Sequence, residues 1–234
     1  MLLDLIQTAL SGGEIRWLLI SFLLSLPVIL FSLSFHEYAH AFAAHKMGDQ
    51  TARNFGRLTL NPAKHLDPMG TLCMLVFGFG WAKPVPVNAR NFDDPRKGMA
   101  LTSVAGPLSN LLLAFVSLFF SMLWNSLVLP LTIQGGETLF YLAYFFGVLL
   151  DTMHWMNLYL ALFNLLPIPP LDGSRLLLVI LPDKVYFGIM KYEQITYILV
   201  IVLLATGILT GALSTVSGWI SLGMQTVIGW LPFL

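Results

Sequence analysis

Charged residues and cysteine are both scarce in this sequence of 234 residues. Only 10% of the residues are charged, and the twelve Lys and Arg residues balance the twelve Asp and Glu residues. A chain without net positive charge lacks the basic footprint that nucleic-acid binding requires, so we exclude that class of partner. The one cysteine, Cys73, has no second thiol with which to form an internal disulfide or a cysteine-based metal site.

Hydrophobic residues make up 57% of the chain, and its mean hydropathy is +0.79. That composition is typical of a polytopic membrane protein. A membrane-spanning helix needs about 20 apolar residues, and five stretches are suitable: 17–44, 99–131, 138–166, 194–213 and 215–234. The stretch 66–81 is shorter and rich in glycine, and it suits a re-entrant segment better than a crossing. We therefore predict an all-α polytopic membrane protein with about five to six membrane segments, forming a single domain over residues 1–234.

Basic residues gather in the loops 46–65, 83–98 and 184–191, whereas residues 126–136 carry no charge. Cytoplasmic loops of membrane proteins are enriched in Lys and Arg. We therefore predict that these three basic loops face the cytoplasm.

The stretch His36-Glu37-Tyr38-Ala39-His40 matches the pattern H-E-x-x-H and lies inside an apolar segment. Residues four apart share one face of a helix, so both imidazoles can reach one metal ion while Glu37 stands beside it. A carboxylate in that place can activate water as a general base. Ionisable groups at membrane depth are costly and usually functional, so we favour a zinc site over buried structural side chains.

Two histidines leave a catalytic zinc ion one protein ligand short. Asp172 follows three prolines in the stretch 164–173, which end one helix and hold the chain extended before the next apolar run. An aspartate in this position can bind a metal, or it can cap the following helix, and the two roles are compatible. Asp151 is the reserve candidate for the third ligand.

A polar stripe marks the apolar segment that contains Asp151, because five residues recur there at steps of three and four and all but Ala161 are polar: Asp151, His154, Asn157, Ala161 and Asn164. Such a stripe faces the interior of a helix bundle or water. It either lines a water path and supports the metal ligands, or it forms hydrogen bonds between helices. The sequence leaves both alternatives open.

Three elements together make the chain resemble the site-2 protease family of intramembrane zinc metalloproteases. They are residues 36–40, the stretch 105–110 (Ala-Gly-Pro-Leu-Ser-Asn), and residues 164–173, which match N-x-x-P-x-P-x-L-D-G. The resemblance covers residues 20–182. It implies that His36, His40 and Asp172 bind one zinc ion, that Glu37 is the general base, and that Asn164 contacts the substrate backbone or the oxyanion.

The same resemblance implies a compact form of the family, without an added regulatory domain, in the cytoplasmic membrane of a prokaryote. Its substrates would be membrane proteins or signal-peptide remnants, cut in or near their membrane segments during regulated intramembrane proteolysis. The stretches 54–60 and 81–88 read as strands or as ordinary loops with equal weight, and the resemblance favours a small β-sheet or hairpin at the cytoplasmic interface. Such a sheet would bind an unwound substrate by strand addition.

Three other functions fit the sequence less well. A membrane zinc protease whose third ligand is the Glu of E-x-x-x-D is disfavoured, because neither Glu137 nor Glu193 begins that pattern. A metal transporter would need ligands distributed along a path, often in repeated halves, whereas this chain has one dense cluster. An inactive relative that only binds its partner would not need intact H-E-x-x-H and L-D-G elements.

Overall fold

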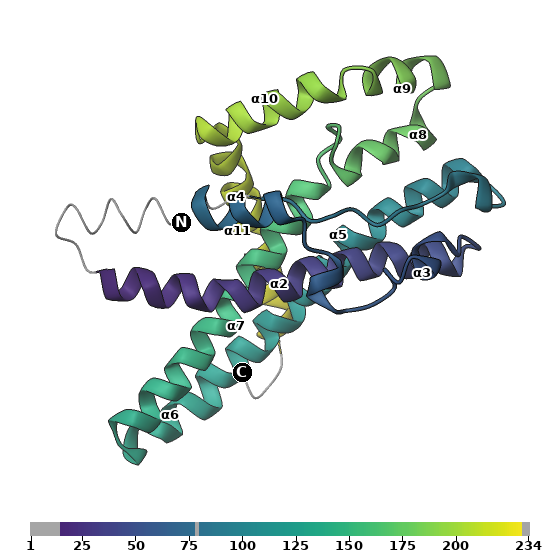
Figure 1. Ribbon diagram of the computed structural model, residues 1–234. Helices are drawn as coiled ribbons and strands as arrows, with labels where there is room; N and C mark the ends of the chain where they lie inside the picture. The colour runs from purple at the N-terminus through teal and green to yellow at the C-terminus, as the bar shows by residue number, and fades with distance from the viewer. Residues whose placement is uncertain (1–14, 78–79, 231–234) are drawn as a thin grey trace.

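The computed structural model describes residues 15–77 and 80–230, and Figure 1 shows that the chain is built from helices. The α-helices are α2 (Ile15–Lys46), α3 (Thr51–Asn54), α4 (Pro68–Phe77), α5 (Pro95–Leu123), α6 (Leu129–Thr132), α7 (Glu137–Asn164), α8 (Leu177–Ile180), α9 (Asp183–Met190), α10 (Glu193–Ala205) and α11 (Ile208–Ile228). Shorter helical turns are η1 (Pro62–Lys64), η2 (Ala89–Asn91), η3 (Trp124–Val128), η4 (Ile133–Gly135) and η5 (Asp172–Leu176).

Helix α5 is the centre of the bundle and packs against both α2 and α7. Asp94 caps its first turn by accepting hydrogen bonds from the backbone N–H groups of Arg96 and Lys97, and Pro95 occupies the first helical position, where no backbone donor is needed. Many of the buried residues of α5 are small, which lets the neighbouring helices approach closely: Gly98, Ala100, Ser103, Gly106, Ala114, Ser117 and Ser121.

Three helical stretches are long and apolar enough to cross a membrane: Phe22–Lys46, Pro95–Thr132 and Glu137–Asn164. A fourth is obtained if α9 and α10, which meet at a bend of 60°, count as one broken span. The all-α membrane architecture agrees with the sequence prediction, but within the described residues there are fewer candidate spans than the five to six we expected. Helix α11 is not among them, and residues 231–234 of the last predicted span lie outside the described residues.

The predicted re-entrant stretch 66–81 contains α4, which has ten residues. A helix of that length rises only about 15 Å, half of the thickness of the hydrocarbon core. Gly78 and Phe79, which follow it, lie outside the described residues. The segment is therefore too short to cross, and its return through the same face stays a prediction.

The predicted β-sheet or hairpin is wrong. Across residues 15–77 and 80–230 the only β-pairing in this region is one isolated antiparallel bridge between Leu66 and Ala82. The stretch 54–60 begins at the end of α3 and continues as turns. In the stretch 81–88, Pro84 and Pro86 have no N–H group to donate, and the N–H groups of Val85 and Asn88 bond to side-chain carboxylates instead of a neighbouring strand.

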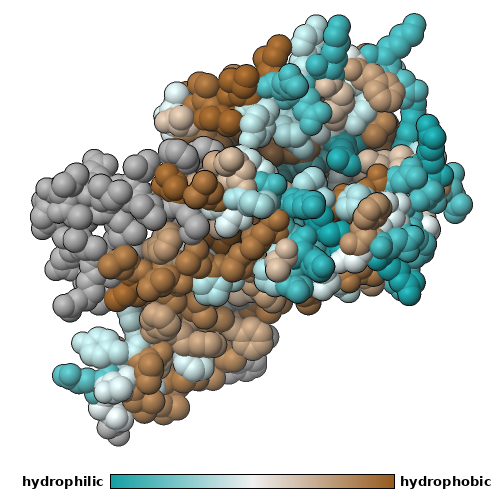
Figure 2. Space-filling view, in the orientation of Figure 1, coloured by the Kyte–Doolittle hydropathy of each residue, from teal (hydrophilic) through white to brown (hydrophobic). Residues whose placement is uncertain are grey.

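Polar and apolar surfaces are separated along the molecule. Figure 2 shows hydrophilic side chains gathered at one end, over α3, the beginning of α5 and α9, while hydrophobic side chains dominate the remaining coloured face apart from a small hydrophilic group at its lower left tip. An ion pair between Arg96 and Asp183 joins the beginnings of α5 and α9 at this end. The beginnings of α5 and α9, which belong to two of the basic loops, therefore lie at the same end of the molecule. Which side that end faces stays a prediction.

Candidate metal centre

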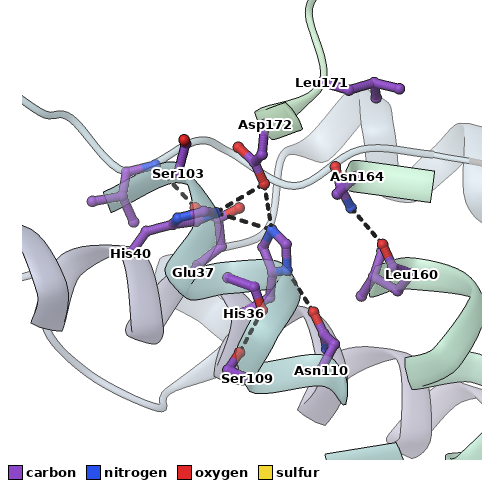
Figure 3. Close-up of polar contacts among 12 residues, drawn as sticks. His36, Glu37, His40, Ser103, Ser109, Asn110, Leu160, Asn164, Leu171 and Asp172 are labelled. Atoms are coloured by element: carbon purple, nitrogen blue, oxygen red, sulfur yellow. Dashed lines mark hydrogen bonds and ion pairs between the residues drawn. The ribbon is translucent and has the colours of Figure 1, made fainter. Parts of the chain in front are cut away.

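Helix α2 presents three residues of the H-E-x-x-H motif to the interior of the bundle, as Figure 3 shows. His36, Glu37 and His40 are exposed by only 4%, 8% and 7%. The two imidazoles lie one helical turn apart, with their ring centroids 4.6 Å from each other. The spacing of four residues thus places both rings on the face that the sequence predicted.

Asp172 reaches the same point from the other side, as the first residue of η5. The chain leaves α7 at Asn164 and turns back through the proline-rich stretch, so that η5 packs against α5 and Gly173 lies against the backbone of Leu165, just after α7. Gly173 permits this close packing, because a Cβ atom there would lie 2.3 Å from the carbonyl oxygen of Leu165. The Asp-Gly pair therefore fixes the aspartate beside the two histidines.

Three ligand atoms converge in this centre. The Oδ2 atom of Asp172 lies 3.0 Å from Nε2 of His36 and 3.1 Å from Nε2 of His40, and the two Nε2 atoms are 3.0 Å apart. Three donors at the corners of a tetrahedron with metal–ligand bonds of about 2.0–2.1 Å would be separated by about 3.3 Å. The nearly equilateral triangle therefore fits three ligands of one small ion.

The hydrogen bonds behind the rings support the same assignment. Nδ1 of His36 lies 2.5 Å from Oδ1 of Asn110, and Nδ1 of His40 lies 2.7 Å from the carbonyl oxygen of Thr102. Both partners are acceptors, so both Nδ1 atoms carry the hydrogen in the neutral rings. Each Nε2 atom then directs a lone pair toward the other Nε2 and toward the carboxylate, an arrangement that a cation between them stabilises.

Helix α5 positions both rings because Thr102, Gly106 and Asn110 follow one another at steps of four on the face that meets α2. The Asn110 amide is held in turn, since its Nδ2 donates to Oδ1 of Asn157 at 2.7 Å. Asn157 donates to the hydroxyl of Ser32 at 2.8 Å, and all three of these side chains have no exposed surface. This network fixes the orientation of His36 from α2, α5 and α7 together.

The polar stripe of α7 serves both of the roles that the sequence left open, support of the metal ligands and hydrogen bonding between helices. Asn157 supports a candidate metal ligand, as above. Asp151 instead accepts a hydrogen bond from Ser121 of α5, and His154 bonds to the carbonyl oxygen of Ala114 and the hydroxyl of Ser221 on α11. Asp151, the reserve ligand, is not part of the metal-ligand group within the described residues.

Gly106 lies directly against the candidate ligands. A Cβ atom at this position would lie 2.4 Å from Nε2 of His40 and 2.8 Å from Cε1 of His36. We expect Gly106→Ala to displace both rings and to lower zinc affinity by more than the 10–100-fold typical of changes behind a metal ligand. Competition with a zinc chelator measures this affinity. Gly218→Ala on α11, where a Cβ atom meets nothing within 4 Å, is the matched control, and equal affinities of the two variants would contradict the expectation.

A cavity of about 750 Å³ opens beside the centre and is lined by His36, Glu37, His40 and Asp172. Apolar residues of α10, such as Val200 and Ile201, also line it. Asn164, the other predicted site residue, also lines this cavity and donates from Nδ2 to the carbonyl oxygen of Leu160 at 3.0 Å (Figure 3). The volume falls in the range of small-molecule and peptide side-chain sites, about 300–1,000 Å³.

Four groups at this centre have no role that the sequence alone predicts: the Thr102 carbonyl, Gly106, Asn110 and the Val85 amide. Gly106 and Asn110 lie in the stretch 105–110 that carried part of the family resemblance, and an asparagine in an apolar helix is itself a signal. The Thr102 carbonyl and the Val85 N–H are backbone groups, and the identity of a residue does not reveal the partners of its backbone groups.

Comparison with known proteins agrees with the geometry of a metal centre. The family described as "Peptidase family M50" matches residues 24–210. The chain is 44% identical over 178 residues to "Putative zinc metalloprotease YwhC" of Bacillus subtilis, covering 76% of this chain and 78% of that protein. It is 32% identical over 177 residues to "Putative zinc metalloprotease MJ0611" of Methanocaldococcus jannaschii, covering 73% and 84%. No solved structure matches the chain.

Proposed function

The chain belongs to peptidase family M50 and is a zinc metalloprotease held in a membrane, and from this premise we propose that it hydrolyses peptide bonds within or beside the membrane segments of other proteins. Anchored regulatory proteins and signal-peptide remnants are the substrate classes we favour. Cleavage of the first class would constitute regulated intramembrane proteolysis.

The depth of the candidate centre along α2 carries this proposal. Glu37 lies nine residues before Lys46, the last residue of the candidate span. Nine helical residues rise about 14 Å, which is nearly half of a hydrocarbon core about 30 Å thick. A peptide bond that reaches Glu37 must therefore come from a segment that itself enters the membrane.

Each group of the site has a proposed task. His36, His40 and Asp172 hold the zinc ion, which when bound acts as a Lewis acid that makes water more acidic and polarises the scissile carbonyl group. Glu37 takes a proton from the attacking water and passes it to the leaving amine. Asn164 lies in the cavity wall, where its amide can bind the substrate backbone or the oxygen on which negative charge develops.

The decisive experiment compares two forms of one peptide sequence in proteoliposomes that contain the purified protein. One form carries the sequence within a membrane-spanning segment. The other is a soluble peptide that carries only the residues around the cleavage site. We expect mass spectrometry to find cleavage inside or next to the span, to find it stopped by a zinc chelator, and to find it restored by zinc. Cleavage of the soluble form alone would contradict an intramembrane protease, and zinc uptake without cleavage would favour a transporter.

A further inference from the structure

Residues 82–88, which we call the strap, run past the catalytic helix and are held at both ends. At the first end, the Lys83 N–H donates to the carbonyl oxygen of His65 at 2.8 Å, and the Lys83 carbonyl accepts a hydrogen bond from the Arg57 guanidinium. At the second end, the Asn88 N–H donates to the Asp49 carboxylate at 2.7 Å. Arg57 and Asp49 are both buried, so the strap is attached to groups that are themselves fixed.

The Asp49 carboxylate at the second end is itself held by several hydrogen bonds. It accepts hydrogen bonds from the N–H and hydroxyl of Thr51, from the Asn88 N–H and from the Asn91 amide. Burial alone would raise the pKa of Asp49, but these hydrogen bonds outweigh it and hold the pKa below its ordinary value. Because a lowered pKa keeps the group ionised at neutral pH, this attachment is lost only as the pH falls through the lowered pKa.

Between its two attachments the strap offers a single backbone donor to the catalytic helix. The N–H of Val85 donates to Oε2 of Glu37 at 3.0 Å. Pro84 and Pro86 on either side have no N–H group, so no adjacent donor competes with it. Within the described part of the chain, no other hydrogen-bond donor contacts the Glu37 carboxylate.

We propose that the backbone N–H of Val85 is a positioning group that holds one oxygen of Glu37 so that the other oxygen faces the attacking water. Its catalytic consequence rests on the proposed function, whereas the contact itself does not. A carboxylate on a long side chain has several rotamers, and a charge-assisted hydrogen bond selects one of them. A backbone amide does not titrate in the working pH range, so it can hold the carboxylate without exchanging protons with it.

The test compares Val85→Pro, which removes the N–H, with Val85→Ala, which keeps it and shortens the side chain. Proline between two prolines preserves an extended backbone. We expect Val85→Pro to lower kcat by roughly 10–100-fold, as a small misplacement of a reacting group does, with KM and zinc stoichiometry unchanged. Val85→Ala keeps the N–H and should therefore have a kcat at least about tenfold higher than that of Val85→Pro. Equal kcat values for the two variants would overturn the proposal.

A second measurement needs neither zinc nor turnover and does not depend on the folding of Val85→Pro. Hydrogen–deuterium exchange is followed in the zinc-free protein on a fragment that covers residues 83–88, in which the two prolines carry no amide hydrogen. We expect the Val85 amide to exchange slowly and to become at least about tenfold faster in Glu37→Ala, because its acceptor is gone. An unchanged exchange rate would refute the positioning role, even if the proposed peptidase activity had failed its own test.

Discussion

Replacing Glu37 with Gln should lower the rate of peptide hydrolysis by about 10²–10⁴-fold, the usual contribution of a general base, while the bound zinc is retained. Glutamine has the shape of glutamate and can still accept the Val85 hydrogen bond through its carbonyl oxygen. It cannot take a proton from water. Glu37 is not one of the three converging ligands, so the metal site should persist. Initial rates of cleavage and zinc content by mass spectrometry check both parts of this result.

Glu137→Gln is the matched control, because Glu137 is an exposed residue at the beginning of α7 and should tolerate the same change. Two outcomes would count against our assignment. Normal turnover of Glu37→Gln would mean that another group activates the water. If Glu37→Gln lost both its zinc and its activity, Glu37 would belong to the groups that hold the metal, and its role as a base would have no support.

The sequence could predict half of the candidate centre because that half is local. His36, Glu37 and His40 lie within five residues, and the geometry of one helix brings them together without any knowledge of the tertiary fold. Asp172 lies far along the chain, and its place at the centre was inferred from the proline-rich stretch and from the family resemblance. Asn157 and Asn110 support His36 only because α2, α5 and α7 meet, which periodicity alone does not specify.

The incorrect strand prediction has a physical cause. Alternation and prolines in residues 81–88 are typical of an edge strand, and they are equally typical of a chain held by side chains. The acceptors to which the backbone N–H groups bond decide between these two structures. The Val85 and Asn88 N–H groups bond to Glu37 and Asp49, which precede the stretch by many residues, and no local pattern reveals such partners. The same residues that suggested substrate binding by strand addition therefore make the strap.

Removing the Asp172 carboxylate should lower the zinc affinity far more than Glu37→Gln does. Asp172→Ala deletes one of three proposed ligands, and two imidazoles alone make an incomplete catalytic zinc site. Because changes behind a ligand already cost 10–100-fold in affinity, we expect zinc affinity to fall by more than about 100-fold and cleavage to fall with it. Chelator competition measures the affinity, and circular dichroism of the zinc-free protein checks that the helices remain.

Asp151→Ala provides the matched control for this change, because Asp151 is the other aspartate of the sequence-predicted candidates. Its carboxylate bonds to Ser121 and lies outside the converging triangle, so zinc affinity should stay within a few-fold of that of the unmodified protein. Equal zinc occupancy of Asp172→Ala and the unmodified protein would remove Asp172 from the ligand set. Loss of zinc from Asp151→Ala instead would transfer the third ligand to α7, and η5 would then keep Asp172 near the histidines only as a hydrogen-bond acceptor.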